Sequence, residues 1–213
     1  MPKKPARSPV PKPKPITKST DSGEWHRGAD VEIHLYAKSL QKAAQILVAT
    51  LDPGDHFKTA WDVGPVILLY RQAVELRLKL LVGEGGRFLA SPTDSITLST
   101  THSIRWLAQI VCRIIRAVNW EAEFKCEGIS SLEDFSMLVA ELDSLDPVSA
   151  AIRADKSGLP GAIPASLQKS KIVNVVPKLD AMLDLLDAMT DGLAATVDLM
   201  ELDAKPGQKQ MVH

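Results

Sequence analysis

The chain has 213 residues, 45% of them hydrophobic and 24% charged, which is ordinary for a globular protein of one domain. Its 25 basic and 26 acidic residues leave a net charge of −1, which excludes a uniformly basic nucleic-acid binder but permits a local basic patch. No apolar run reaches 18 residues, no apolar signal segment opens the chain, and two cysteines make neither a disulfide framework nor a metal cage. We therefore expect a cytoplasmic protein without a membrane span, metal or cofactor.

The first segment is basic and rich in proline. Residues 1–18 hold six Lys or Arg, six Pro and no acid. Proline lacks the N–H that a helix needs, and so few apolar residues cannot build a core. We predict a disordered basic tail over 1–24, a helical domain over 25–204 and a flexible end over 205–213. The tail is either a solubilising segment or an electrostatic tether to nucleic acid or an acidic partner.

A first helix is predicted over 29–51, because apolar residues recur there at helical spacing and 52–55 combines proline with glycine. Its apolar face consists of Val31, Leu35, Leu40, Ala43, Ala44 and Leu47.

A second helix is predicted over 65–82, with Pro65 in its first turn and the glycines of 83–86 as its stop. Apolar side chains cover more than half of its circumference, which is typical of a central helix. Arg71, Glu75 and Lys79 stand four residues apart on its one polar strip, so two pairs of opposite charge can form. The strip is either a salt-bridged ladder on a wet face or the wall of a polar cleft.

Residues 87–98 are predicted to form a loop with a short extended piece at 96–98, followed by a third helix over 101–118. The apolar face of this helix is opposed by a basic one, made of His102, Arg105, Gln109, Arg113 and Arg116. The positive end of the helix dipole favours a neutral His102, which can accept a proton. The arginines either hold phosphate or form a solvated face.

A fourth helix is predicted from Ser130 or Ser131 to Leu145, and a long connection without clear periodicity follows over 146–170. A last helix is predicted over 174–203, with Pro177 in its first turn and an acidic stripe of Asp180, Asp184, Asp187, Asp191 and Asp198. This stripe is either a solvated face or a docking site for a basic partner. About five helices and no strong strand pattern predict an all-α, up-and-down helical bundle.

Three ordered motifs resemble those of HEPN-type domains of bacteria. Residues 71–79 are similar to the Glu-Leu-x-Leu-Lys helix of that family, and 101–104 to the His-x-hydrophobic motif that opens a later helix. Residues 146–153 resemble its Asp-Pro-x-Ser segment, although Ile152 and Ala154 flank Arg153 where the family has aromatic residues, and the late Arg-x(4–6)-His motif is missing. The resemblance spans 62–155. It implies a helical bundle, commonly a homodimer, in a family of metal-independent ribonucleases and toxins of defence systems and of non-catalytic partners.

Three classes of function stay open: a HEPN-like ribonuclease, a non-catalytic module that dimerises or binds a protein, and an RNA or nucleotide binder without turnover. A ribonuclease needs a base for the 2′-hydroxyl proton and a cation for the phosphorane. The predicted catalytic residues are His102 as the base, Arg153 as the cation and Arg71 as a second phosphate contact. The predicted binding and orienting residues are Glu75, Lys79, Arg105 and Asp146.

Overall fold

The computed structural model describes residues 22–50, 60–89, 95–145 and 169–203. Residues 1–21 of the predicted basic tail and the candidate residues Asp146 and Arg153 lie outside the described residues. Residues 22–24, predicted as the end of the disordered tail, are helical instead. Within them every regular element is helical, so the predicted all-α bundle is confirmed. The elements are α1 (Ser22–Thr50), α2 (Ala60–Gly85), the 3₁₀ helix η1 (Gly86–Phe88), α3 (Ser95–Thr100), α4 (Ile104–Ala117), α5 (Leu132–Leu145) and α6 (Lys169–Asp203).

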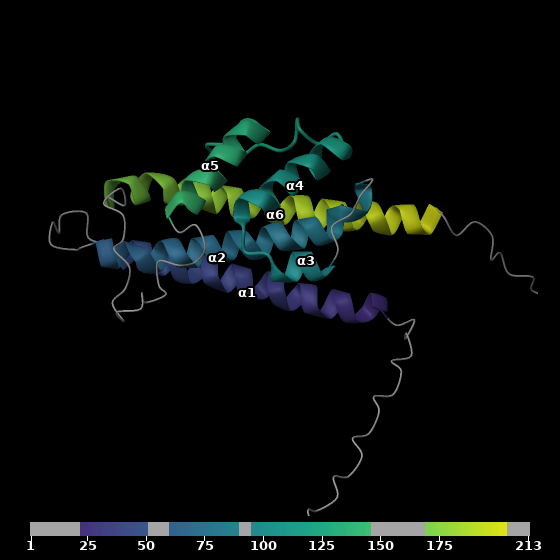
Figure 1. Ribbon diagram of the computed structural model, residues 1–213, viewed down its shortest axis with the longest axis horizontal. Coiled ribbons are helices and arrows are strands. Elements are labelled where there is room, and N and C mark those ends of the chain that lie inside the picture. The colour runs from purple at the N-terminus through teal and green to yellow at the C-terminus, as the bar shows by residue number, and fades with distance from the viewer. Residues whose placement is uncertain (1–21, 51–59, 90–94, 146–168, 204–213) are drawn as a thin grey trace, which may run out of the picture.

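Helix α2 lies at the centre of the bundle, as its mostly apolar circumference predicted (Figure 1). It packs against α1, α6 and α4. Its side chains Val66, Tyr70, Val74, Leu78 and Leu81 are buried. Removing such residues from water on several sides of one helix is the main favourable term that holds this bundle together.

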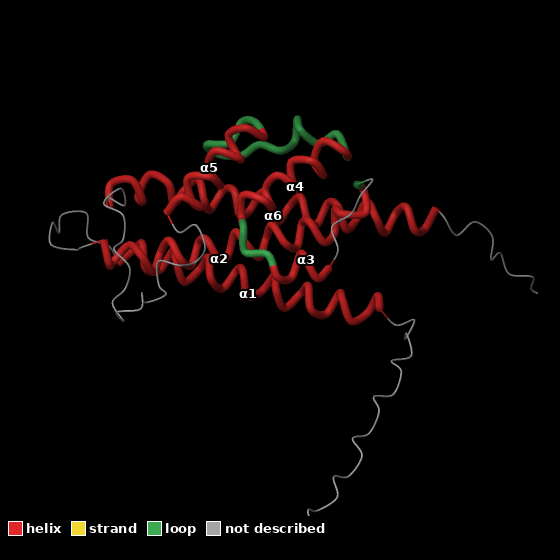
Figure 2. The backbone as a smooth tube through the Cα atoms, in the orientation of Figure 1, coloured by secondary structure: helices red, strands yellow, loops and turns green. Residues whose placement is uncertain are grey.

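The helices form two groups that run across one another (Figure 1, Figure 2). Contacts at Tyr70–Asp180 and Arg77–Asp187 advance seven residues on each helix, so α2 and α6 run in the same direction. Helix α1 runs antiparallel to both. Helices α4 and α5 form an antiparallel pair that lies over this three-helix layer and brings the opening of α4 against the middle of α2.

The two helices that contain proline begin earlier than predicted. Helix α2 starts at Ala60 and α6 at Lys169, so Pro65 and Pro177 lie inside their helices rather than in the first turn. The β-branched run before Pro177 is therefore helical. Helix propensities differ among such residues by only tenths of a kcal/mol per position, and the packing of Val175 and Val176 against the core outweighs that preference.

The predicted loop over 87–98 is partly helical. Helix η1 continues directly from α2, and α3 is a short helix where the extended piece was predicted. Leu98 of α3 packs against the core, which explains why this segment folds back onto α2.

Gly85 does not break α2 by a left-handed turn, since its φ is −82°. Instead it permits close packing, because a Cβ there would lie 2.5 Å from Cγ2 of Ile114.

The first helix begins at Ser22, before the predicted start, and its apolar face is only partly correct. Ala44 is buried, and Leu40 and Leu47 pack against the core. Val31 and Leu35 are instead more than half exposed. Nearer its N-terminus, α1 meets α2 and α6 through polar groups such as His34, so these two apolar side chains are left on the outer surface.

Candidate functional site

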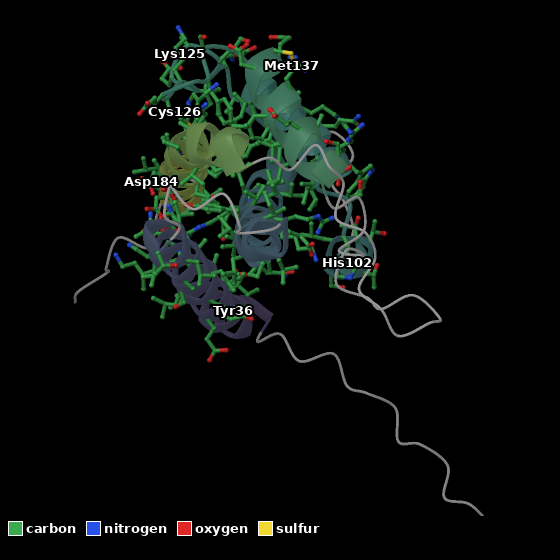
Figure 3. The ribbon with its side chains drawn as sticks, turned by 90° about the vertical axis from the view of Figure 1, so that its left-hand side faces the viewer. Tyr36, His102, Lys125, Cys126, Met137 and Asp184 are labelled. Atoms are coloured by element: carbon green, nitrogen blue, oxygen red, sulfur yellow. The ribbon has the colours of Figure 1, made fainter. Side chains whose placement is uncertain are left out.

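The candidate site lies where α4 begins. Ser103 caps this helix, as its Oγ accepts a hydrogen bond from the N–H of Trp106. His102 therefore stands just before the helix, one residue outside the cap, rather than in the first turn as predicted. Its side chain is 62% exposed and projects from the side of the bundle opposite Asp184 (Figure 3).

Glu75 of α2 holds the ring of His102. The carboxylate is buried at 1% exposure, and its Oε1 lies 2.9 Å from Nδ1 of His102. An ionised carboxylate has no hydrogen to donate, so Nδ1 carries the proton of the neutral ring. The other nitrogen, Nε2, then has a lone pair and can accept a proton from a bound molecule.

Two cations neutralise Glu75. Lys79 Nζ lies 3.0 Å from Oε1, and Arg71 Nη1 donates to Oε2 over 3.3 Å. Both predicted pairs of the strip are therefore present. The strip is not a wet face, however, because Arg71 and Glu75 are buried. Lys79, which is half-buried, also donates to the carbonyl of Ser99 in α3.

Helix α5 closes the other side of this cluster. Arg105, in the first turn of α4, pairs with Asp143 over 3.0 Å and donates to the carbonyl of Ala140. Asp143 also lies 3.7 Å from Arg71 Nη2. These contacts fix the end of α5 beside the opening of α4, so the chain leaves α5 close to His102.

The structure thus brings together five of the seven predicted site residues, from α2 and the opening of α4. They are Arg71, Glu75, Lys79, His102 and Arg105. Arg71 differs from its predicted role, since it is fully buried and donates to the carbonyl of His102 over 2.8 Å. We define these five residues together with Asp143 as the His102 cluster. Where Asp146 and Arg153 lie relative to it falls outside the described residues.

A second polar cluster was missed by the sequence reasoning. His34 of α1, Arg77 of α2 and Asp187 of α6 meet between the three helices, and we call them the His34 cluster. Arg77 Nη1 lies 2.6 Å from His34 Nδ1 and donates to Asp187. Burial lowers the pKa of Arg77, and the nearby Asp187, Asp191 and Asp184 oppose that shift. The available signal was a third basic residue on the apolar helix α2, opposite the strip of Arg71 and Glu75.

The acidic stripe of α6 is not simply a solvated face. Asp180 accepts hydrogen bonds from Gln41, Gln45 and Tyr70, each over 3.0 Å. Burial, together with the charge of Asp180, raises the pKa of Tyr70 well above its ordinary value. Asp184, Asp191 and Asp198 are exposed. The stripe therefore divides into carboxylates that join α6 to α1 and α2 and carboxylates that face solvent.

Other chemistry finds little support among the described residues. No group of three His, Cys, Asp or Glu there is arranged to hold a metal ion. Cys112 is buried, which raises the pKa of its thiol, in keeping with a core position. None of the described helices combines the length and apolar character that a membrane span requires.

Comparisons of this chain with protein-family models, with curated proteins and with solved structures found no match. The resemblance to HEPN-type domains therefore rests on its three motifs, two of which contribute residues to the His102 cluster.

Proposed function

We propose that the protein is a metal-independent endoribonuclease of HEPN-like character, with His102 as its general base. The observation that carries the proposal is a mostly exposed imidazole whose Nδ1 is held by a buried carboxylate, so that Nε2 is the nitrogen left to accept a proton. The wider setting, a bacterial defence or toxin-type system, comes only from the motif resemblance.

The chemistry uses the substrate's own hydroxyl as nucleophile. His102 Nε2 takes the 2′-hydroxyl proton, the 2′ oxygen bonds to the adjacent phosphorus, and the 5′ oxygen leaves and takes a proton from solvent. The products are a 2′,3′-cyclic phosphate and a 5′-hydroxyl end. Lys79 and Arg105 supply positive charge beside His102 for the phosphorane. Arg153 is proposed as a further cation, because the end of α5 is fixed next to this site.

The test is cleavage of a labelled mixed-sequence RNA in excess EDTA. Wild type is compared with His102→Gln and Arg153→Ala, and with His34→Gln as the matched control. His34 also neighbours a carboxylate, but its cluster lies on the other side of α2. We expect cyclic phosphate ends from wild type and His34→Gln, and strong loss in His102→Gln. Equal cleavage by wild type and His102→Gln would contradict the assignment. RNA binding without cleavage would instead favour a binder without turnover.

A second candidate, a non-catalytic dimerisation or partner-binding module, is favoured by the outer face of α1. Val31 and Leu35 lie one turn apart and are each more than half exposed. Ile46, which is also exposed, lies on the same side three turns further on, with the exposed Lys38 and Lys42 between. Adjacent exposed apolar residues often mark a protein interface. If this face joins two copies, light scattering will show a dimer for wild type and a monomer for Leu35→Glu. A wild-type monomer at all concentrations would remove the homodimer.

A further inference from the structure

Arg71 is a buried cation at the junction of three helices. Its side chain is 0% exposed. Its guanidinium donates to the carbonyl of His102 and to Glu75, and it lies 3.7 Å from Asp143. Arginine keeps its charge in proteins, so its burial requires such partners. In this position the side chain cannot touch a substrate, which leaves its role in the site to be explained.

The contacts of Arg71 fix His102 at two points. One is the main chain, where the carbonyl of His102 accepts from Nη2 over 2.8 Å. The other is the ring, because Nη1 bonds Oε2 of Glu75 while Oε1 of the same carboxylate faces Nδ1. One guanidinium therefore aligns both the backbone that carries the imidazole and the carboxylate that selects its tautomer.

Arg77, six residues later on the same helix, contacts a histidine in a different way. Its Nη1 lies 2.6 Å from Nδ1 of His34. Oδ1 of Asp187 lies 3.1 Å from the same nitrogen. Nδ1 of His34 therefore faces a donor and an acceptor at once, and these contacts select neither tautomer of its neutral ring. Arg71 instead contacts a carbonyl and a carboxylate and leaves Nδ1 of His102 as a donor. At His102 the arginine leaves Nδ1 to the carboxylate, whereas at His34 the arginine and the carboxylate both face Nδ1.

We propose that Arg71 is a positioning residue that holds His102 as the Nδ1–H tautomer, with Nε2 unprotonated and directed outward. The catalytic consequence of this inference rests on the proposed function, but the tautomer itself can be measured without RNA. In the enzyme, misplacing a general base by about 1 Å is enough to lower the rate on the order of 100-fold.

The test is long-range ¹H–¹⁵N NMR of the full-length, ¹⁵N-labelled chain, at a pH where the rings are neutral. The signals of His102 are identified as those that disappear in His102→Gln. Wild type should show Nδ1 protonated and Nε2 unprotonated in His102. In Arg71→Lys, which keeps the charge but not the two-point contact, we expect the signals to shift toward a mixture of both tautomers. The matched control is Arg77→Lys, an equally buried arginine on the same helix, which should leave His102 unchanged.

The same spectra report folding, because His34 should keep its signals in Arg71→Lys. A wild-type His102 protonated on Nε2 would overturn the proposal even if no Arg71 variant folds. So would an unchanged Nδ1–H tautomer in folded Arg71→Lys. On cleavable RNA we expect kcat to fall on the order of 100-fold with little change in KM. If wild type cleaves no RNA but the tautomer shifts as expected, the positioning role stands and the proposed function fails.

Discussion

The His102 and His34 clusters each combine a histidine, a carboxylate and an arginine on opposite sides of α2, but they arrange these groups differently. In each, a histidine lies against a carboxylate, and an arginine of α2 completes the group. At His102 the carboxylate is buried and the ring is exposed. At His34 the ring is 32% exposed, the carboxylate is also partly exposed, and the arginine contacts the ring directly. The first arrangement presents a proton acceptor to solvent, whereas the second joins three helices.

This difference shows that a carboxylate beside a histidine does not by itself indicate a base. The hydrogen bond made by the inner nitrogen decides what the outer nitrogen can do. Burial of Glu75, rather than of His102, leaves the imidazole exposed while the carboxylate that holds it is buried. Five variants test how far the two clusters differ.

The largest effect is expected from Glu75→Gln. The buried Arg71 and the half-buried Lys79 would lose their shared anion, and removing one partner of a buried ion pair costs about 3–5 kcal/mol. The amide would also no longer impose the Nδ1–H tautomer on His102. We expect a lower free energy of unfolding in urea and loss of cleavage even in the folded fraction. Wild-type stability would show that the cluster contributes nothing to the fold.

Asp187→Asn makes the matching change in the His34 cluster and should cost less, about 1.5–3 kcal/mol. Asp187 is partly exposed, and the negative charges of Asp184 and Asp191 still act on Arg77. Urea unfolding of Glu75→Gln and Asp187→Asn under the same conditions shows which variant loses more stability. Since Asp187 is remote from His102, RNA cleavage by the folded protein should be unchanged. Reduced cleavage with an intact fold would mean that the clusters are coupled through α2.

The sequence predicted the His102 cluster better than the His34 cluster for a physical reason. Arg71, Glu75 and Lys79 are neighbours on one helix face, so their pairing follows from local spacing alone. Arg77, His34 and Asp187 come from three helices, and their meeting depends on how those helices pack. The same limit applies to Asp180, which the sequence predicted to belong to a solvated face or a docking site, although its carboxylate bonds Tyr70 and two glutamines of α1.

The helical fold could be predicted from hydrophobic periodicity. The predictions that were wrong concern segments where packing outweighs the local conformational preference of the residues. The apolar face of α4 and the start of α5 after Ser131 agree with the predictions from the sequence. The early starts of α2 and α6 and the short helix α3 were not predicted. In these segments, burial of apolar side chains such as Val176 and Leu98 outweighs the unfavourable local helix propensity.

Tyr70→Phe tests the polar contact next to the His34 cluster and should cost about 1 kcal/mol at neutral pH. The pKa of Tyr70 is raised by burial and by Asp180, so the unfolded chain ionises first, near its ordinary value of about 10. Wild-type stability should therefore fall as the pH rises above about 10, and the variant should lose less over that range. Urea unfolding at neutral and alkaline pH measures both, and equal slopes would contradict the buried, bonded hydroxyl.

The smallest effect on the free energy of unfolding is expected when each histidine is replaced by glutamine. This comparison also separates the two histidines most directly. His102 is mostly exposed, so His102→Gln should change the free energy of unfolding by no more than about 0.5 kcal/mol. His34→Gln removes a contact of the buried Arg77 and should cost about 1 kcal/mol. Cleavage is expected to show the reverse order, with loss only in His102→Gln. A residue that matters little for stability but greatly for activity has a role in function, so the same order in both measurements would contradict that role for His102.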